Sequence, residues 1–330
     1  MLDQTALEQF EADGFLVVEG VLDLARDVQP ILDEYAALLD RLASKWYLEG
    51  KIGSRYSELP FLKRLSHVAR DLADHGESFH PYLDISLQLE DGKLREDAPI
   101  HLGPAVFGLL TSSRLLDVVE SVIGSEITCH PTQHVRMKLP EEFVEGITNN
   151  GQMNSMVGAT EWHQDQGVFL PEADESNVLT AWVPMTGATV ANGCLMVVPR
   201  SQQDGLATHC PQAGNLYVPD QFIPFERIIP VPVKLGDVLL LNNQTLHASL
   251  SNKSDDVRWS FDLRYVPTGN PTGRPSEFPS FVARSRQEPE TELRDADAWA
   301  AMWLETRAWL AGVVEVPQLT RWSADAPVCL

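Results

Sequence analysis

Residues 257–266 read Val-Arg-Trp-Ser-Phe-Asp-Leu-Arg-Tyr-Val, with polar and apolar side chains in strict alternation from Arg258 onward. This period of two predicts a β-strand, because successive side chains of a strand point to opposite faces. Arg258, Ser260, Asp262 and Arg264 share one face, and four large apolar residues share the other. A strand with one charged face in an otherwise apolar region indicates that this face lines a cavity.

The segments around this strand are also short, apolar or alternating, and Pro, Gly and Asn separate them. They lie at 132–139, 161–170, 178–184, 194–199, 231–234 and 237–247. The dipeptide Asn192-Gly193 is a strong signal for a tight turn, and Gly236-Asp237 marks another. Evenly spaced short strands of this kind predict a sandwich, a jelly roll or a barrel.

The residues before 127 are predicted to be mostly helical. Thr5 can cap a short helix, and Gly14 then releases the chain into an apolar strand at 15–18. Apolar residues recur at helical spacing from Leu24 to Leu48, and a second helix is predicted near 106–123.

Two stretches are predicted to be long functional loops, Glu141–Thr160 and Thr268–Pro289. A C-terminal helix is expected near 292–310. We therefore interpret residues 1–330 as a single domain with three parts: a mostly helical part at 1–126, a β core at 127–267, and a Pro-rich loop with the C-terminal helix at 268–330.

Composition limits the classes of function. The chain has 25 Lys and Arg against 47 Asp and Glu, a net charge of −22, which argues against a nucleic-acid partner. No signal peptide and no run of about 18 apolar residues is present, so no membrane partner and a cytoplasmic location are expected. Four cysteines show neither a CxxC pair nor metal-ligand spacing, so reduced thiols are expected: Cys129, Cys194, Cys210 and Cys329.

The run Trp162-His163-Gln164-Asp165 places an imidazole and a carboxylate two positions apart. On a strand these two side chains share one face. The strand predicted at 237–247 ends in His247, which supplies a second imidazole from a distant part of the chain. Two imidazoles and one carboxylate leave half of an iron coordination sphere open, which indicates oxygen chemistry.

Arg258 follows His247 on the next strand. A guanidinium can hold a carboxylate through two parallel hydrogen bonds, and Ser260 can donate another. Arg264 could play this part instead, although Asp262 beside it offers an ion pair. A His-x-Asp sequence alone is expected by chance about once in such a chain. The hypothesis of an iron site therefore depends on the combination of this sequence with His247 after an apolar strand and with Arg258 and Ser260 on the next strand.

With these residues the chain resembles the phytanoyl-CoA dioxygenase-like branch of the Fe(II)/2-oxoglutarate oxygenases. The resemblance covers most of the chain. The segments that carry it are Phe10–Val18, Gln133–Pro140, Trp162–Asp165, Ala181–Pro184, the Asn192-Gly193 turn, Pro199–Ser201, Gly236-Asp237 and the stretch from His247 to Arg258.

The resemblance implies a mainly β fold with flanking helices around a double-stranded β-helix, a jelly roll of the cupin type. It implies Fe(II) bound by His163, Asp165 and His247, with 2-oxoglutarate and O₂ as co-substrates. The residues implied at 2-oxoglutarate are Arg258, Ser260, Ser249, Trp182 and Gln133. From the residues alone, Trp182 fits a place in the core equally well, and Ser249 a turn.

The implied activity is hydroxylation of an unactivated C–H bond of a small organic metabolite, with release of succinate and CO₂. The carboxylate of Asp165 favours hydroxylation over halogenation, because related halogenases have a small residue there. Desaturation, epoxidation and ring formation use the same triad. Two alternatives stay open: a cupin-like metal-dependent hydrolase or isomerase in which Arg258 clamps a substrate carboxylate, and a non-catalytic 2-oxoglutarate-binding protein. The sequence identifies neither the substrate nor the oligomeric state.

Overall fold

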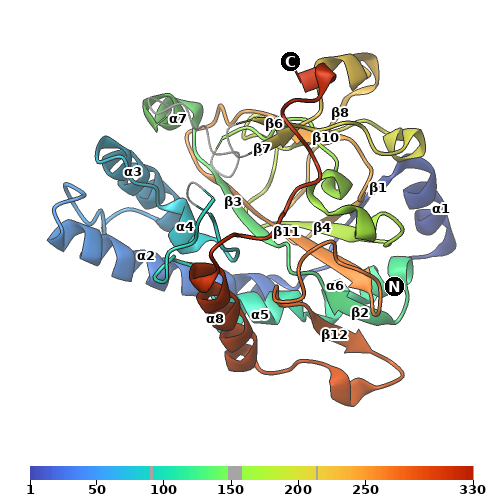
Figure 1. The fold of residues 1–330 in the computed structure, drawn as a ribbon. Helices are drawn as coiled ribbons and strands as arrows, with labels where there is room; N and C mark the ends of the chain where they lie inside the picture. Colours follow the sequence, from blue (N-terminus) through green and yellow to red (C-terminus); the bar gives the residue numbers. More distant parts are fainter. Residues whose placement is uncertain (90–91, 148–157, 213–214, 330) are drawn as a thin grey trace.

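The computed structural model describes residues 1–89, 92–147, 158–212 and 215–329 (Figure 1). Its N-terminal part is mostly helical, as predicted. The elements there are α1 (Gln4–Asp13), β1 (Phe15–Val18), the π-helical turn η1 (Leu24–Val28), α2 (Gln29–Leu48), α3 (Phe61–Asp74), α4 (His80–Leu83), α5 (Pro104–Leu110) and α6 (Ser113–Ile123). Gly14 has a φ of 79°, which lets α1 end and β1 begin at once.

Two of the helical predictions need correction. Helix α1 is capped by Asp3 rather than Thr5, because Oδ1 of Asp3 accepts a hydrogen bond of 2.8 Å from the backbone N–H of Ala6. The single helix predicted near 106–123 is two helices, α5 and α6. The backbone leaves the helical region at Ser112, where ψ is 122°, so a second helix has to start after it.

The rest of the chain forms antiparallel strands. They are β2 (Glu126–Cys129), β3 (His134–Lys138), β4 (Leu179–Pro184), β5 (Leu195–Val197), β6 (Cys210–Gln212), β7 (Asn215–Tyr217), β8 (Ile229–Val231), β9 (Val238–Asn242), β10 (His247–Ser249), β11 (Arg258–Pro267) and β12 (Phe281–Ser285). The largest sheet has the order β1-β9-β4-β11-β2-β12, with β3 also paired to β11, and the sheet that faces it across the site has the order β10-β5-β8. Strands β6 and β7 form a separate pair. The fold is therefore mainly antiparallel sheet with flanking helices.

The alternation predicted for β11 is confirmed by its packing. Trp259, Phe261, Leu263 and Tyr265 are buried in the main core, which they share with the helices. Trp182, on β4, packs the opposite way, in a second apolar cluster that joins the two sheets. The polar residues of β11 face this space between the sheets, because they alternate with the core residues.

Two predicted strands are interrupted where they approach each other. No strand forms at 161–170. His163 makes only an isolated bridge with His247, and the chain then enters the 3₁₀ turn η3 (Asp165–Val168). The strand expected at 237–247 is split into β9 and β10 by a turn. The N–H of Gln166 donates to the carbonyl of Asn243 at 2.7 Å, so the two irregular segments satisfy each other.

The two predicted loops contain regular structure. Glu141–Thr160 begins as helix α7 (Glu141–Ile147), and its residues 148–157 lie outside the described residues. Thr268–Pro289 contains β12, which pairs with β2. The C-terminal helix α8 (Ala296–Gly312) lies close to its predicted place and contacts α5 (Figure 1).

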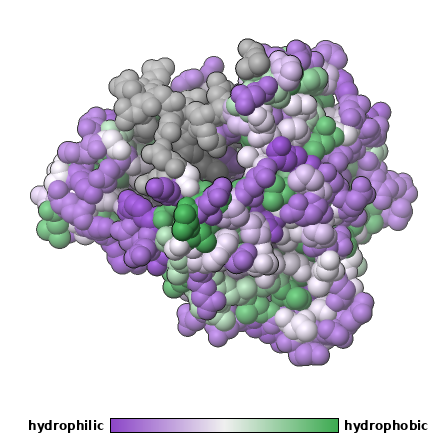
Figure 2. All heavy atoms as spheres, in the orientation of Figure 1, coloured by the Kyte–Doolittle hydropathy of each residue, from purple (hydrophilic) through white to green (hydrophobic). Residues whose placement is uncertain are grey.

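The expectation of four reduced cysteines is wrong for one pair, because Cys210 and Cys329 form a disulfide. They are 119 residues apart, so no local spacing signals the bond, which depends on the C-terminal segment returning to β6 (Figure 1). Cys129 and Cys194 are free and buried. Hydrophilic residues cover most of the face in Figure 2. In the described part of the chain, every helix is too short or too polar to cross a membrane.

Candidate metal centre

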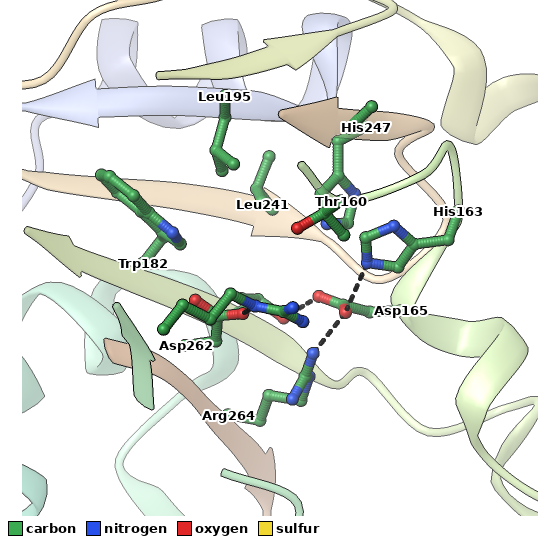
Figure 3. A pocket seen from close by; sticks show the side chains of 12 residues that line it. Thr160, His163, Asp165, Trp182, Leu195, Leu241, His247, Asp262 and Arg264 are labelled. Carbon is green, nitrogen blue, oxygen red and sulfur yellow. Dashed lines mark hydrogen bonds and ion pairs between the residues drawn. The ribbon is translucent and has the colours of Figure 1, made fainter. Parts of the chain in front are cut away.

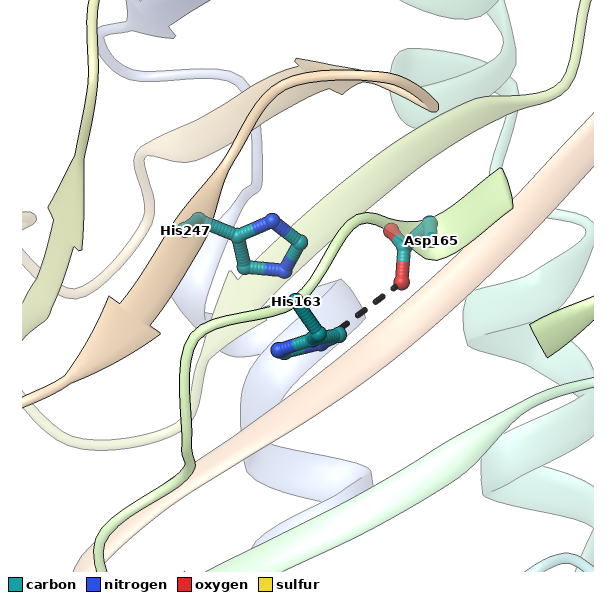
Figure 4. A group of neighbouring side chains, drawn as sticks. All are labelled: His163, Asp165 and His247. Carbon is teal, nitrogen blue, oxygen red and sulfur yellow. Dashed lines mark ion pairs between the residues drawn. The ribbon is translucent and has the colours of Figure 1, made fainter. Parts of the chain in front are cut away.

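Three side chains from two segments of the chain converge between the two sheets (Figure 4). His163 precedes η3, Asp165 begins η3, and His247 begins β10. All three are buried, and one ligand atom of each lies within 4.8 Å of the others. His163 Nε2 lies 4.0 Å from Asp165 Oδ1. Two imidazoles and a carboxylate at this spacing form a set that suits a divalent transition metal.

Backbone carbonyl groups orient both imidazoles. His163 Nδ1 lies 2.8 Å from the carbonyl oxygen of Glu161, and His247 Nδ1 lies 2.9 Å from that of Thr245. A carbonyl oxygen only accepts, so each Nδ1 carries a proton, and in the neutral ring it is Nε2 that has the lone pair. Burial and the neighbouring His247 lower the pKa of His163 well below its ordinary value. The ring of His163 is therefore neutral, the form that binds metals.

The carboxylate of Asp165 is held from both sides (Figure 3). Oδ1 accepts a hydrogen bond of 2.5 Å from Arg264 Nη2, and Oδ2 accepts one of 2.5 Å from Thr180 Oγ1. Burial by itself would raise the pKa of Asp165, but the charge of Arg264 and its hydrogen bond hold it well below its usual range. Asp165 is therefore ionised and fixed. The sequence predicted neither Thr180 nor this partner for Arg264.

Trp182 lies beside the triad. It lines a small cavity of about 10 Å³ together with the triad, Leu195 and Leu241 (Figure 3). A second cavity, of about 400 Å³, adjoins the first, and both are lined by Arg136, His163 and Arg264. A volume of this size is typical of small-molecule sites.

Arg258 lies behind Trp182, with its guanidinium carbon 5.3 Å from the centre of the indole ring. The side chain is completely buried, and its Nη1 donates to Ser260 Oγ at 2.6 Å. Its Nε and Nη2 atoms have no hydrogen-bond partner in the described part of the chain. Burial lowers the pKa of Arg258 to about 10, which leaves it charged at neutral pH. Most of its hydrogen-bonding capacity is therefore unused.

Lys138 is a buried cation near Arg258 that the sequence reading overlooked. It pairs with Arg258 in the β3–β11 register, and its Nζ donates to Ser249 Oγ and, at 3.2 Å, to the carbonyl of Leu250. Ser249 Oγ also accepts from the N–H of Thr160 at 2.8 Å. The sequence did contain a signal for Lys138, because polar residues alternate with apolar ones at positions 134, 136 and 138, which predicts a polar strand face like that of β11.

Gln133 is not brought to either cavity. Its Nε2 donates to the carbonyl of Arg264 at 2.9 Å, and its Oε1 accepts from the N–H of Arg264 at 2.9 Å. Both ends of the amide are thus used to tie the backbone before β3 to β11. The described contacts give Gln133 a structural part instead of one at a co-substrate.

Comparison with known proteins is consistent with this geometry. The family model of phytanoyl-CoA dioxygenase matches residues 10–260. Phytanoyl-CoA dioxygenase domain-containing protein 1 of Bos taurus is 23% identical over 291 residues, which cover 84% of this chain and 94% of the relative. The protein of the same name from Danio rerio is 28% identical over 123 residues, which cover 35% of this chain and 42% of the relative. That alignment therefore spans less than half of the fish protein.

Two solved structures share the fold. The non-heme monooxygenase ThoJ has a TM-score of 0.55 at 16% identity, with 93% of this chain and 98% of that chain covered. EvdO2 from Micromonospora carbonacea var. aurantiaca has a TM-score of 0.52 at 16% identity, with 81% and 91% covered. At such identities the similarity concerns the fold alone.

Proposed function

The chain belongs to the phytanoyl-CoA dioxygenase family, and from this premise we propose that it is an Fe(II)/2-oxoglutarate-dependent oxygenase that hydroxylates a C–H bond of a small organic metabolite. The proposal includes a double-stranded β-helix core formed by the two sheets. The observation that carries it is that His247, from a distant strand, brings its ligand atom within 4.8 Å of those of His163 and Asp165.

The triad fits Fe(II). Both imidazoles turn Nδ1 to a backbone carbonyl, so Nε2 is the nitrogen left for a metal, and the carboxylate is already ionised. Three protein ligands leave the other positions of the metal to co-substrate and O₂. Arg264 and Thr180 would orient the carboxylate ligand, as outer hydrogen bonds do at many metal sites.

The surroundings of Arg258 fit the distal carboxylate of 2-oxoglutarate. The Nε and Nη2 atoms of Arg258 have no hydrogen-bond partner among the described residues, and a carboxylate could accept hydrogen bonds from both. Ser260 already orients the guanidinium, and Ser249, on β10 of the other sheet, accepts a hydrogen bond from Lys138. The cavity beside the triad has room for roughly one water, so we expect Trp182 to change rotamer when the co-substrate enters.

The bound iron and 2-oxoglutarate would supply the oxidising chemistry, in which 2-oxoglutarate, O₂ and the substrate yield succinate, CO₂ and the hydroxylated substrate. The protein's own part is positioning and exclusion of water. Carbonyl groups hold the imidazoles, Arg264 holds Asp165, and Arg258 orients the co-substrate. Leu195 and Leu241 provide an apolar wall that keeps bulk water from the reacting centre.

The test is an anaerobic titration of the protein with Fe(II) and 2-oxoglutarate. We expect a visible metal-to-ligand charge-transfer band that needs both components, and slow 2-oxoglutarate-dependent release of succinate after O₂ is admitted. A protein that binds Fe(II) without forming this band would contradict the proposal. Full activity with zinc or without O₂ would favour the hydrolase or isomerase alternative. The band without succinate release, across a screen of metabolites, would favour the binding-protein alternative.

A further inference from the structure

The larger cavity next to the metal centre contains three arginines. Besides Arg136 and Arg264 it is lined by Arg274, which follows β11 and lies in the segment that leads to β12. His163 lines both cavities, so a molecule in the larger one lies next to the metal centre. Three guanidinium groups around one cavity are notable in a chain of net charge −22.

Two of these arginines already have carboxylate partners. Arg136 forms an ion pair with Asp262, and Arg264 forms one with Asp165. Arg274 differs: among the described residues, no carboxylate oxygen lies within 4.0 Å of its nitrogens, and its only hydrogen bonds run from Nη1 to the carbonyls of Gly273 and Leu319. Its Nε and Nη2 atoms are left to a further partner.

The environment of Arg274 disfavours its charge. Burial and the nearby Arg264 lower the pKa of Arg274 to about 10, although Glu172 acts in the opposite direction. The group remains protonated at neutral pH, so it is a half-buried cation, and no carboxylate of the described residues lies within ion-pair distance of it. The carboxylate of Glu161 lines the same cavity and is exposed to solvent.

The backbone beneath Arg274 is firmly held. Gly273 has a φ of 65°, and a Cβ at this position would lie 2.8 Å from Cβ of Phe169. The carbonyl of Gly273 accepts from the N–H of Leu170 at 3.3 Å, and the carbonyl of Thr272 lies 2.8 Å from His130 Nε2. A cation on a fixed backbone loses little conformational freedom when it binds an anion.

We propose that Arg274 binds an anionic oxygen group of the substrate, a carboxylate or a phosphate, and so directs the rest of a small organic anion toward the metal centre. The inference rests on the proposed function, because it takes the larger cavity as the substrate site. Arg258 holds the co-substrate in that scheme, and Arg274 holds the substrate. A planar guanidinium favours an oxyanion through paired hydrogen bonds, which an uncharged analogue cannot provide.

The test uses matched probes: aliphatic and aromatic carboxylates, their methyl esters, and phosphate monoesters of the parent alcohols. Binding is measured by thermal shift and calorimetry, on the protein alone and on the anaerobic complex with saturating Fe(II) and 2-oxoglutarate. We expect carboxylates or phosphates to bind at least about ten-fold more tightly than the esters. The two anionic arms show which oxyanion the site prefers.

The variants are Arg274→Gln, Arg274→Lys, and Arg294→Gln as a control on the surface, where Arg294 is 70% exposed. Arg274→Gln should lose roughly ten-fold or more in anion affinity, Arg274→Lys should keep part of it, and the control should match wild type. Equal anion binding by wild type and Arg274→Gln, or no anion in the panel that binds, would overturn the proposal.

Whether Arg274 only stabilises the fold is tested by a measurement that needs no ligand. Because a cation without a counter-ion costs desolvation, Arg274→Gln should unfold at the same temperature as wild type or higher. A clear fall in its melting temperature, with anion binding unchanged, would show that Arg274 serves the fold. Formation of the Fe(II)/2-oxoglutarate band does not depend on Arg274, so its absence would count against the proposed function alone.

Discussion

Arg264 and Arg258 lie on the same face of β11, and both are buried, but their surroundings differ. Arg264 donates to the carboxylate of Asp165 and to the carbonyl of Thr132. Among the described residues, Arg258 hydrogen-bonds only to Ser260, and two of its nitrogens have no hydrogen-bond partner. A buried cation with an internal carboxylate positions part of the protein, whereas one without a counter-ion is suited to bind an anion from outside.

The largest effect should come from removing the carboxylate that Arg264 holds. Asp165→Ala takes away a metal ligand, so we expect turnover to be lost and Fe(II) affinity to fall by more than about 100-fold. It also leaves Arg264 buried without its partner, which should lower the free energy of unfolding by about 3–5 kcal/mol. Iron titration and chemical denaturation measure the two effects.

The double variant Asp165→Ala/Arg264→Met separates these effects. It removes the unpaired charge, so much of the stability should return while iron binding stays lost. A double variant as unstable as Asp165→Ala would mean that the ion pair does not account for the loss. Retained turnover in Asp165→Ala would remove this residue from the ligand set.

Arg258→Met should give the next largest effect, and it should affect 2-oxoglutarate rather than the metal. Loss of a buried charged partner costs about 2–5 kcal/mol of binding, so the Kd for 2-oxoglutarate should rise roughly 30-fold or more. Fe(II) affinity in the absence of 2-oxoglutarate should be unchanged. The charge-transfer band, titrated with 2-oxoglutarate, reports the change. An unaltered Kd would indicate that Arg264 or Lys138 holds the co-substrate instead.

Arg264→Lys should have a moderate effect on the metal. The charge remains, but the fork that fixes Asp165 and reaches Thr132 is lost. A change in the outer hydrogen bonds of a ligand typically lowers metal affinity by about 10- to 100-fold. The Kd for 2-oxoglutarate should change much less than in Arg258→Met. A larger rise of the Kd for 2-oxoglutarate in Arg264→Lys than in Arg258→Met would mean that Arg264, and not Arg258, binds the co-substrate.

The sequence predicted the faces of β11 but not the partners of its charges. Asp262 was expected to pair with Arg264, its neighbour on the same face, yet it pairs with Arg136 of β3. Same-face neighbours along a strand lie almost 7 Å apart, while residues on adjacent strands come closer, so the partner depends on strand order. One sequence without strand order cannot provide that information.

The same limit explains the other differences at the site. The sequence indicated His163, Asp165 and His247 because residue type and spacing are local signals. It missed Thr180, which reaches Asp165 only after β4 packs beside η3, and it missed the Cys210–Cys329 disulfide. Each of these contacts joins segments whose approach is decided by the packing of the sheets.

The smallest effect should come from Lys138, the cation nearest to Arg258 in the strand register. Lys138→Met replaces a buried ammonium by an apolar side chain of similar length, so the free energy of unfolding at pH 7 should stay the same or rise. Ser249→Ala, in contrast, leaves both Lys138 Nζ and the N–H of Thr160 without this acceptor, and should cost about 1–3 kcal/mol.

The pH dependence of stability distinguishes this from a simple packing change. Burial, together with Arg258 and Arg136, lowers the pKa of Lys138 well below its ordinary value of about 10.4. Between the folded and unfolded pKa values the unfolded chain binds one more proton, so wild-type stability gains from Lys138 as the pH rises through this window. Lys138→Met should lack that gain. Parallel curves of unfolding free energy against pH for the two proteins would show that the pKa of Lys138 is not lowered in the folded state.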